Sequence, residues 1–156
     1  MSIFLKIEQE RGIVARIYSD FSAFPESVEA HFELNKALIL AENAPLTRKE
    51  REFLAYETSS YNKNVYCATH HKKAYENFKV NNDESQERFE LLSKLANILT
   101  TRPEKSALLK PQFLSNGFTE AEWQHAVNIV AYFNYTNRLA FAMNITLEAD
   151  YEDSCN

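Results

Sequence analysis

The chain has 156 residues, a length that suits one domain with a single core of ordinary size. Apolar residues make up 45% and charged residues 25%, the balance of a globular protein. Two glycines and four prolines are too few for the turns of an all-β domain, so we expect an all-α fold. The net charge of −5, without a basic stripe that could neutralise phosphates, disfavours nucleic-acid binding.

The lengths of the apolar runs and the number of cysteines indicate the cellular compartment of the protein. The N-terminus lacks the long apolar run of a signal peptide, and no stretch approaches the roughly 18 uncharged apolar residues of a membrane-spanning helix. Cys67 and Cys155 are the only cysteines, far below the density of a secreted disulfide scaffold. We therefore expect a cytoplasmic protein with reduced thiols and no membrane partner.

Apolar residues at helical spacing predict about six helices, joined into a single domain over residues 1–148. The predicted helices cover residues 9–22, 26–41, 47–60, 65–80, 84–100 and 119–143. Thr47 and Glu50 fit a capping box, in which a hydroxyl and a carboxylate each satisfy a backbone N–H, and residues 119–122 repeat this motif.

The connections between the helices are also informative. The short break at residues 62–64 predicts antiparallel helices on its two sides. Asn81–Asp83 is expected to cap the helix that follows it. Residues 103–117 form a looser, partly helical connection, at whose end Gly117 can adopt the left-handed conformation without a Cβ penalty. The acidic residues 149–156 are expected to form a flexible tail.

One stretch places a thiol beside two imidazoles. Cys67 and His71 are four residues apart on a predicted helix and His70 lies next to them, so the three share one face. A helix N-terminus and a neighbouring imidazole both lower the pKa of a thiol from its free value of about 8.5. Glu52, on the preceding antiparallel helix, can orient the imidazole. The pattern therefore predicts a reactive Cys67 with a lowered pKa.

Three segments carry motifs that occur together in a known family. They are Pro45–Glu52, Asn62–His71 and Phe133–Ala140. Within them Glu52, Asn64, Cys67 and His71 stand at the spacing of the family pattern Glu, eleven residues, Cys-x-x-Cys, three residues, His. On these motifs the chain resembles the AhpD-like (alkylhydroperoxidase D / carboxymuconolactone decarboxylase) family, and its peroxidase-related subgroup in particular. Tyr66 is a variant common in that subgroup.

The resemblance implies an AhpD-like helical fold, a homo-oligomer (dimer, trimer or hexamer) and thiol peroxidase activity in antioxidant defence. In the family mechanism the second cysteine, here Cys67, attacks the peroxide, while His71 and Glu52 relay protons. The first cysteine then resolves the sulfenic acid as a disulfide. Asn64 stands in its place, and an amide cannot be oxidised and regenerated. Cys67 therefore needs another thiol, either an external one or Cys155.

Plainer interpretations are open for some of these residues. Cys67 can be a buried packing residue, since free cysteine packs well. His70 can be a structural histidine or the wall of a substrate pocket. We expect structural roles for His31 and His125, which lie on other helices.

The remaining residues of the motifs are expected to support the pocket. They are Asn64, Tyr66, His70, Asn134 and Arg138, of which the last two can instead cap or bridge helices. A metal centre is disfavoured because adjacent histidines point about 100° apart on a helix. No flavin, haem, nicotinamide or phosphate-loop motif predicts a cofactor.

We expect the thiol-dependent reduction of a small-molecule hydroperoxide, with an external thiol as the reductant. Cys67 is the nucleophile, His71 its base, and Glu52 the group that orients His71 and shuttles protons. Two other functions fit the same residues. In a carboxymuconolactone decarboxylase-like enzyme, Glu52 and His71 would do acid–base work and Cys67 would be incidental. A non-catalytic member of the family would serve as an assembly or binding module.

Overall fold

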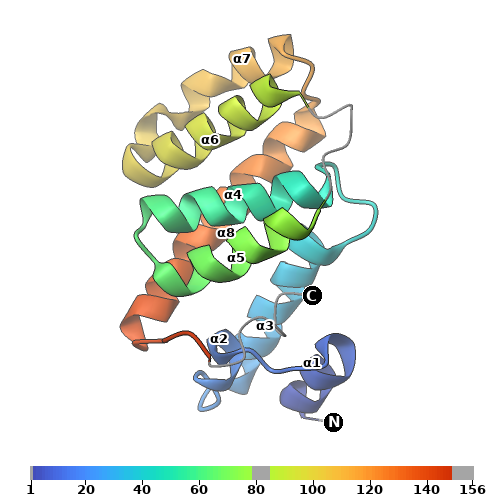
Figure 1. Ribbon diagram of the computed structural model, residues 1–156, viewed down its shortest axis with the longest axis vertical. Coiled ribbons are helices and arrows are strands. Elements are labelled where there is room, and N and C mark those ends of the chain that lie inside the picture. The colour runs from blue at the N-terminus through green and yellow to red at the C-terminus, as the bar shows by residue number, and fades with distance from the viewer. Residues whose placement is uncertain (1, 79–84, 149–156) are drawn as a thin grey trace.

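The computed structural model describes residues 2–78 and 85–148, and every regular element in these ranges is a helix (Figure 1). The predicted all-α fold is confirmed. The elements are α1 (Ile3–Arg11), α2 (Arg16–Ser19), α3 (Pro25–Asn35), a π-helical turn (Lys36–Leu40), α4 (Arg48–Tyr61), α5 (Val65–Asn77), α6 (Gln86–Thr101), a 3₁₀ helix (Pro103–Leu109), α7 (Lys110–Ser115) and α8 (Glu120–Ala142). The eight α-helices of this part of the chain exceed the expected six or so because the first predicted helix is divided into α1 and α2 and the predicted connection at 103–117 contains α7.

The first predicted helix, 9–22, is wrong. Helix α1 ends at Arg11, because Gly12 adopts the left-handed conformation (φ 77°) and its N–H donates to the Glu8 carbonyl at 2.7 Å. Only Arg16–Ser19 continues as a helix beyond this point. The interruption gives the N-terminal segment a bend, so that α1 and α2 lie at the lower end of α3 instead of forming one rod (Figure 1).

The second predicted helix continues past α3 as a π-helical turn. Arg51 of α4 holds the end of this turn, since its Nη1 donates to the carbonyl oxygens of Ile39 (2.5 Å) and Ala41 (2.8 Å). These carbonyls would otherwise be left without partners at a helix end. The contact ties the chain entering α4 to the helix that precedes it.

Helices α4 and α5 form the pair that the short break at 62–64 predicts (Figure 1). The capping box of Thr47 and Glu50 starts α4 as expected. Lys63 takes the left-handed conformation (φ 57°) and turns the chain between the two helices. Helix α5 ends at Asn77, and the expected cap at 81–83 lies outside the described residues. In the described part, Ser85 caps α6.

Helix α8 is the longest helix and links two core clusters. It starts at the second predicted capping box, Thr119 with Glu122. Its first half packs with α4 and α6 around Leu54, Leu92 and Ile129. Its second half reaches a smaller cluster made with α1, α2, α3 and α5, which contains Cys67. None of the helices in the described ranges has the length and apolarity needed to cross a membrane.

Candidate active site

Asn64 begins the helix that carries the thiol. It is 3% exposed, and its Oδ1 accepts a hydrogen bond from the Cys67 backbone N–H at 2.9 Å. Its Nδ2 donates to the carbonyl of Asn137 in α8 at 3.2 Å. Both ends of the amide are therefore used. Asn64 is thus the N-cap of α5 and also joins this helix to α8.

Cys67 lies in the first turn of α5 and is only 3% exposed. Burial raises the pKa of its thiol to about 12, which outweighs a hydrogen bond from the Asn137 side chain that favours the thiolate. The expected lowering of this pKa is wrong. The physical reason is that a thiolate would lose its hydration here, while the Cys67 N–H at the helix start is already occupied by Asn64.

Glu52 and His71 meet across α4 and α5, as the spacing predicts. His71 Nδ1 lies 2.6 Å from Glu52 Oε2, and Arg48 Nε donates to Glu52 Oε1 at 2.8 Å. Burial alone would raise the pKa of the Glu52 carboxyl, but His71 and Arg48 hold it below its usual value. An ionised Glu52 accepts the proton of His71 Nδ1. In the neutral imidazole this leaves the lone pair on Nε2.

His70 has a carboxylate partner that the sequence did not reveal. Its Nε2 lies 2.9 Å from Glu148 Oε2, in the non-helical segment that follows α8. Glu148 Oε1 accepts from the Tyr66 hydroxyl (2.9 Å) and from the backbone N–H of Arg16 (3.1 Å). Burial lowers the pKa of His70, although Glu148 opposes this effect. Glu148 thus holds the C-terminal segment against α5 and α2.

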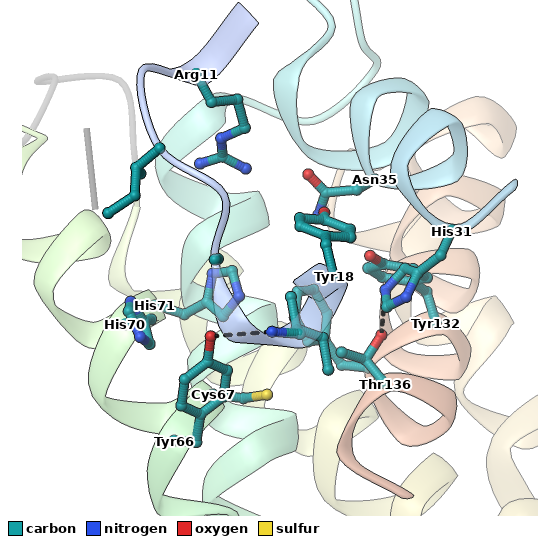
Figure 2. A pocket seen from close by; sticks show the side chains of 14 residues that line it. Arg11, Tyr18, His31, Asn35, Tyr66, Cys67, His70, His71, Tyr132 and Thr136 are labelled. Carbon is teal, nitrogen blue, oxygen red and sulfur yellow. Dashed lines mark hydrogen bonds between the residues drawn. The ribbon is translucent and has the colours of Figure 1, made fainter. Parts of the chain in front are cut away.

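A cavity of about 80 Å³ borders Cys67, with walls from α2, α3, α5, α8 and the segment after α1 (Figure 2). Cys67, His70, His71 and Tyr66 line it together. The sequence analysis missed most of the opposite wall, which consists of Arg11, Ile13, Ala15, Ile17, Tyr18, Asn35, Tyr132, Phe133 and Thr136. Phe133 also packs edge-on against the His71 ring, with centroids 4.5 Å apart.

The two histidines expected to be structural have different surroundings. His125 is structural, since it accepts from the Leu46 N–H at Nδ1 (3.2 Å) and donates from Nε2 to the Leu38 carbonyl (2.9 Å). His31 instead lines the cavity, 3.4 Å from Thr136 Oγ1, and burial lowers its pKa to about 4. It is therefore a neutral wall of the cavity at physiological pH.

The segment Phe133–Ala140 contributes differently from what was expected. Asn62 Nδ2 donates to Asn134 Oδ1 (3.1 Å) and Asn137 Oδ1 (2.9 Å), so both asparagines support the turn between α4 and α5. Arg138 is exposed and donates to the Asn134 carbonyl at 2.6 Å. Neither Asn134 nor Arg138 lines the Cys67 cavity. It is Asn137 whose side chain reaches the thiol.

The histidine and glutamate side chains near Cys67, which are of the types that bind metal ions, pair with one another instead. Within residues 2–78 and 85–148, no three His, Cys, Asp or Glu side chains converge in a way that could hold a metal ion. The arrangement consists instead of one buried thiol flanked by two imidazole–carboxylate pairs, His71 with Glu52 and His70 with Glu148.

Comparison with solved structures identifies the fold of the chain. No family model and no curated protein matches the chain. An uncharacterized peroxidase-related protein from Silicibacter sp. TM1040 superposes with a TM-score of 0.80 at 22% identity, over 99% of this chain and 87% of that chain. An AhpD-core, uncharacterized peroxidase-related protein from Ralstonia eutropha JMP134 gives 0.80 at 21% identity, over 96% and 85%. The chain therefore has the AhpD-like fold of peroxidase-related proteins, which the sequence resemblance predicts.

Proposed function

We propose that the protein is a thiol-dependent peroxidase with one peroxidatic cysteine, Cys67, which reduces hydroperoxides at the expense of an external thiol. The observation that carries the proposal is the shared cavity of Cys67 and His71, combined with the 2.6 Å contact of His71 with Glu52. That contact leaves Nε2 as the ring nitrogen that can accept the thiol proton.

The reaction needs no group beyond these residues and the two substrates. His71 takes the proton of the Cys67 thiol, and the sulfur attacks the terminal oxygen of the hydroperoxide. The S–O bond forms as the O–O bond breaks, and His71 returns the proton to the leaving alkoxide. Cys67 becomes a sulfenic acid, oxidised by two electrons, and the hydroperoxide becomes an alcohol. One external thiol then displaces water to form a mixed disulfide, and a second releases Cys67.

Burial explains why the base matters in this proposal. With a thiol pKa of about 12, almost no Cys67 is ionised at neutral pH. The thiol must then lose its proton during the attack itself. A base held in place by a buried carboxylate supports such a step, because it costs no reorganisation at the moment of reaction.

The reductant is proposed to be external because position 64, three residues before Cys67, holds an asparagine and not a second thiol. The amide at position 64 is engaged at both ends and cannot replace a second cysteine. Cys155 lies outside the described residues.

We also propose that the protein is a cytoplasmic homo-oligomer. The C-terminal half of α8 exposes Tyr135 and Phe141, and Met143 follows it, also exposed. Large exposed apolar side chains favour burial against another copy of the chain. A monomer in sedimentation velocity at micromolar concentration would contradict the assembly.

The raised thiol pKa favours a second candidate, an acid–base enzyme of the carboxymuconolactone decarboxylase type. In that case the Glu52–His71 pair acts on a carbon acid or lactone, and Cys67 is a packing residue. The two candidates differ in whether the sulfur itself is consumed.

Mass spectrometry of Cys67 after addition of one equivalent of tert-butyl hydroperoxide tests the proposal, with a dimedone trap for sulfenic acid. The Cys155→Ser variant removes the other thiol. A dimedone adduct on Cys67, reversed by dithiothreitol in an untrapped sample, is the expected result. A fully unreacted Cys67 would overturn the peroxidase and leave the acid–base candidate. A Cys67–Cys155 crosslink in the wild type would make Cys155 the resolving thiol.

A further inference from the structure

An arginine that has no carboxylate partner among the described residues lies at the cavity. Arg11 is the last residue of α1, and the left-handed Gly12 directs the following residues, Ile13 and Ala15, along the cavity wall. No acid of the part of the chain that the structure describes forms a salt bridge with Arg11, which contacts the Tyr18 hydroxyl instead. Glu52 and Glu148, the carboxylates nearest the site, are committed to other partners.

A buried acceptor to which no described residue donates lines the same cavity as this arginine. Asn35 is 7% exposed, and its Oδ1 has no hydrogen-bond partner among the described residues. Its side chain contacts the Tyr132 hydroxyl. Buried polar atoms are nearly always paired, so an orphan acceptor on a cavity wall indicates a donor that a ligand supplies.

Arg11 and Asn35 belong to the same end of the site. Both line the main cavity, and both also line an adjoining recess of about 40 Å³ with His70 and His71. In Figure 2 the Arg11 guanidinium and the Asn35 amide lie toward one end of the cavity, and the sulfur of Cys67 lies toward the other. A ligand in the cavity would therefore have a polar head at Arg11 and Asn35 and its reacting end at Cys67.

We propose that the cavity selects small organic acids, with the carboxylate against Arg11 and a neighbouring hydroxyl or N–H group donating to Asn35 Oδ1. Resting on the peroxidase function proposed above, this makes the substrate a hydroperoxide or peroxy acid that carries a carboxylate at its far end. The volume agrees with a small molecule, because about 80 Å³ holds several water-sized groups and excludes long acyl chains. The guanidinium supplies charge-assisted hydrogen bonds to the carboxylate.

Three matched probes test the binding without any thiol chemistry. Lactate has the carboxylate and the hydroxyl, propionate lacks the hydroxyl, and 1,2-propanediol lacks the carboxylate. Titration of the wild-type protein, followed by the NMR signals of its imidazole protons, should give lactate about tenfold tighter binding than propionate. Binding of propanediol should be weaker still. Equal affinities for lactate and propanediol would overturn the proposal.

Variants then assign the two contacts. Arg11→Gln should weaken lactate about tenfold or more, and Asn35→Leu should reduce lactate to the affinity of propionate. Lys6→Gln is the matched control, since it removes a cation from the same helix that is paired with Glu33 away from the cavity. Lactate binding unchanged by Arg11→Gln, in a protein with wild-type circular dichroism, would also overturn the proposal.

Kinetics separate this inference from the function on which it rests. Monoperoxysuccinate and peroxybutyrate differ in having a carboxylate or a methyl group at the far end. Cys67 should be oxidised about tenfold faster by monoperoxysuccinate, and Arg11→Gln should remove the difference. Equal rates with both peroxy acids would overturn the substrate class and leave the peroxidase intact. If neither oxidises Cys67, the peroxidase fails, and the binding titrations still decide whether the acid site exists.

Discussion

The cavity has two walls of different construction. On the helical wall, Cys67 and His71 of α5 line the cavity, and Glu52 of α4 and Asn64 at the turn hold them in place from behind. On the terminal wall, Arg11 and Tyr18 line the cavity, and Glu148 near the other end of the described chain supports this wall through Arg16 and Tyr66. Each wall supplies the carboxylate partner of one of two adjacent histidines. His71 pairs with Glu52 on a neighbouring helix, whereas His70 pairs with Glu148, 78 residues away in a non-helical segment.

The two walls have different roles: the helical wall carries the reactive groups, and the terminal wall limits access to them. The helical wall contains the thiol, its base and the carboxylate behind the base, in positions set by helix geometry. The terminal wall is held by a few side-chain contacts and closes the cavity from the other side. We therefore expect damage to the helical wall to affect both folding and reactivity, and damage to the terminal wall to affect mainly the closure of the cavity.

The largest expected effect is on stability. Glu52→Ala should lower the free energy of unfolding by about 3 kcal/mol, because it leaves Arg48 and the imidazole of His71 without their buried partner. Glu148→Ala should cost about 1–2 kcal/mol, since its contacts are nearer to solvent. Urea unfolding followed by circular dichroism measures both, with the exposed Glu8→Ala as the control. Equal losses at the two glutamates would contradict the division into two walls.

Reactivity should distinguish the two histidines. His71→Ala should slow the oxidation of Cys67 by tert-butyl hydroperoxide about 100-fold, the usual contribution of a positioned general base. His70→Ala should slow it only a few fold, because His70 lies in the cavity but is paired with Glu148. Dimedone trapping with rapid quenching gives both rate constants. If the two variants are equally slow, His70 shares the role of base.

The pH dependence of alkylation sharpens the account of the thiol. In a Cys155→Ser background, the rate of iodoacetamide labelling should rise about tenfold per pH unit from pH 7 to 10. The reason is that only the thiolate reacts, and its fraction keeps growing at any pH below the Cys67 pKa of about 12. Because this pKa is raised on folding, the associated stability is complete below the unfolded value and is lost as the pH rises toward 12. A labelling rate that reaches a plateau near neutral pH would show an activated thiolate instead.

The smallest effect concerns the N-cap. Asn64→Cys should lower the free energy of unfolding of the reduced protein by about 1 kcal/mol, because the capping hydrogen bond to the Cys67 N–H is lost. Peroxide should then produce a disulfide between positions 64 and 67, seen by peptide mapping without reductant. Asn64→Ser is the control, because it retains a neutral capping oxygen and, like Cys, lacks the Nδ2 donor to the Asn137 carbonyl; it should be more stable than Asn64→Cys and cannot form the disulfide. Absence of the disulfide would mean that the first turn of α5 is too rigid to bring the two sulfurs together.

The helical wall could be predicted because its information is local. Capping residues and apolar spacing place α4 and α5, and a break of three residues leaves room for little except an antiparallel pair. Once the pair forms, residues four apart on α5 share a face, and Glu52 faces that side from α4. The capping box at Thr119 and the all-helical fold follow from the same kind of local signal.

The terminal wall depended on the tertiary structure. Nothing near Glu148 or Arg11 in the sequence indicates a site. The contacts of Glu148 with Arg16, Tyr66 and His70 join residues 78 to 132 positions apart, and Arg11 shares the cavity with residues of α5 and α8, so neither leaves a periodic pattern. The raised pKa of Cys67 could not be predicted from the sequence either. Local reasoning counts the helix start and the imidazole, which favour the thiolate, but the larger effect is the loss of solvent when α2, α3 and α8 close over the sulfur. Helix positions are decided by neighbouring residues, whereas burial and convergence are properties of the whole packed chain.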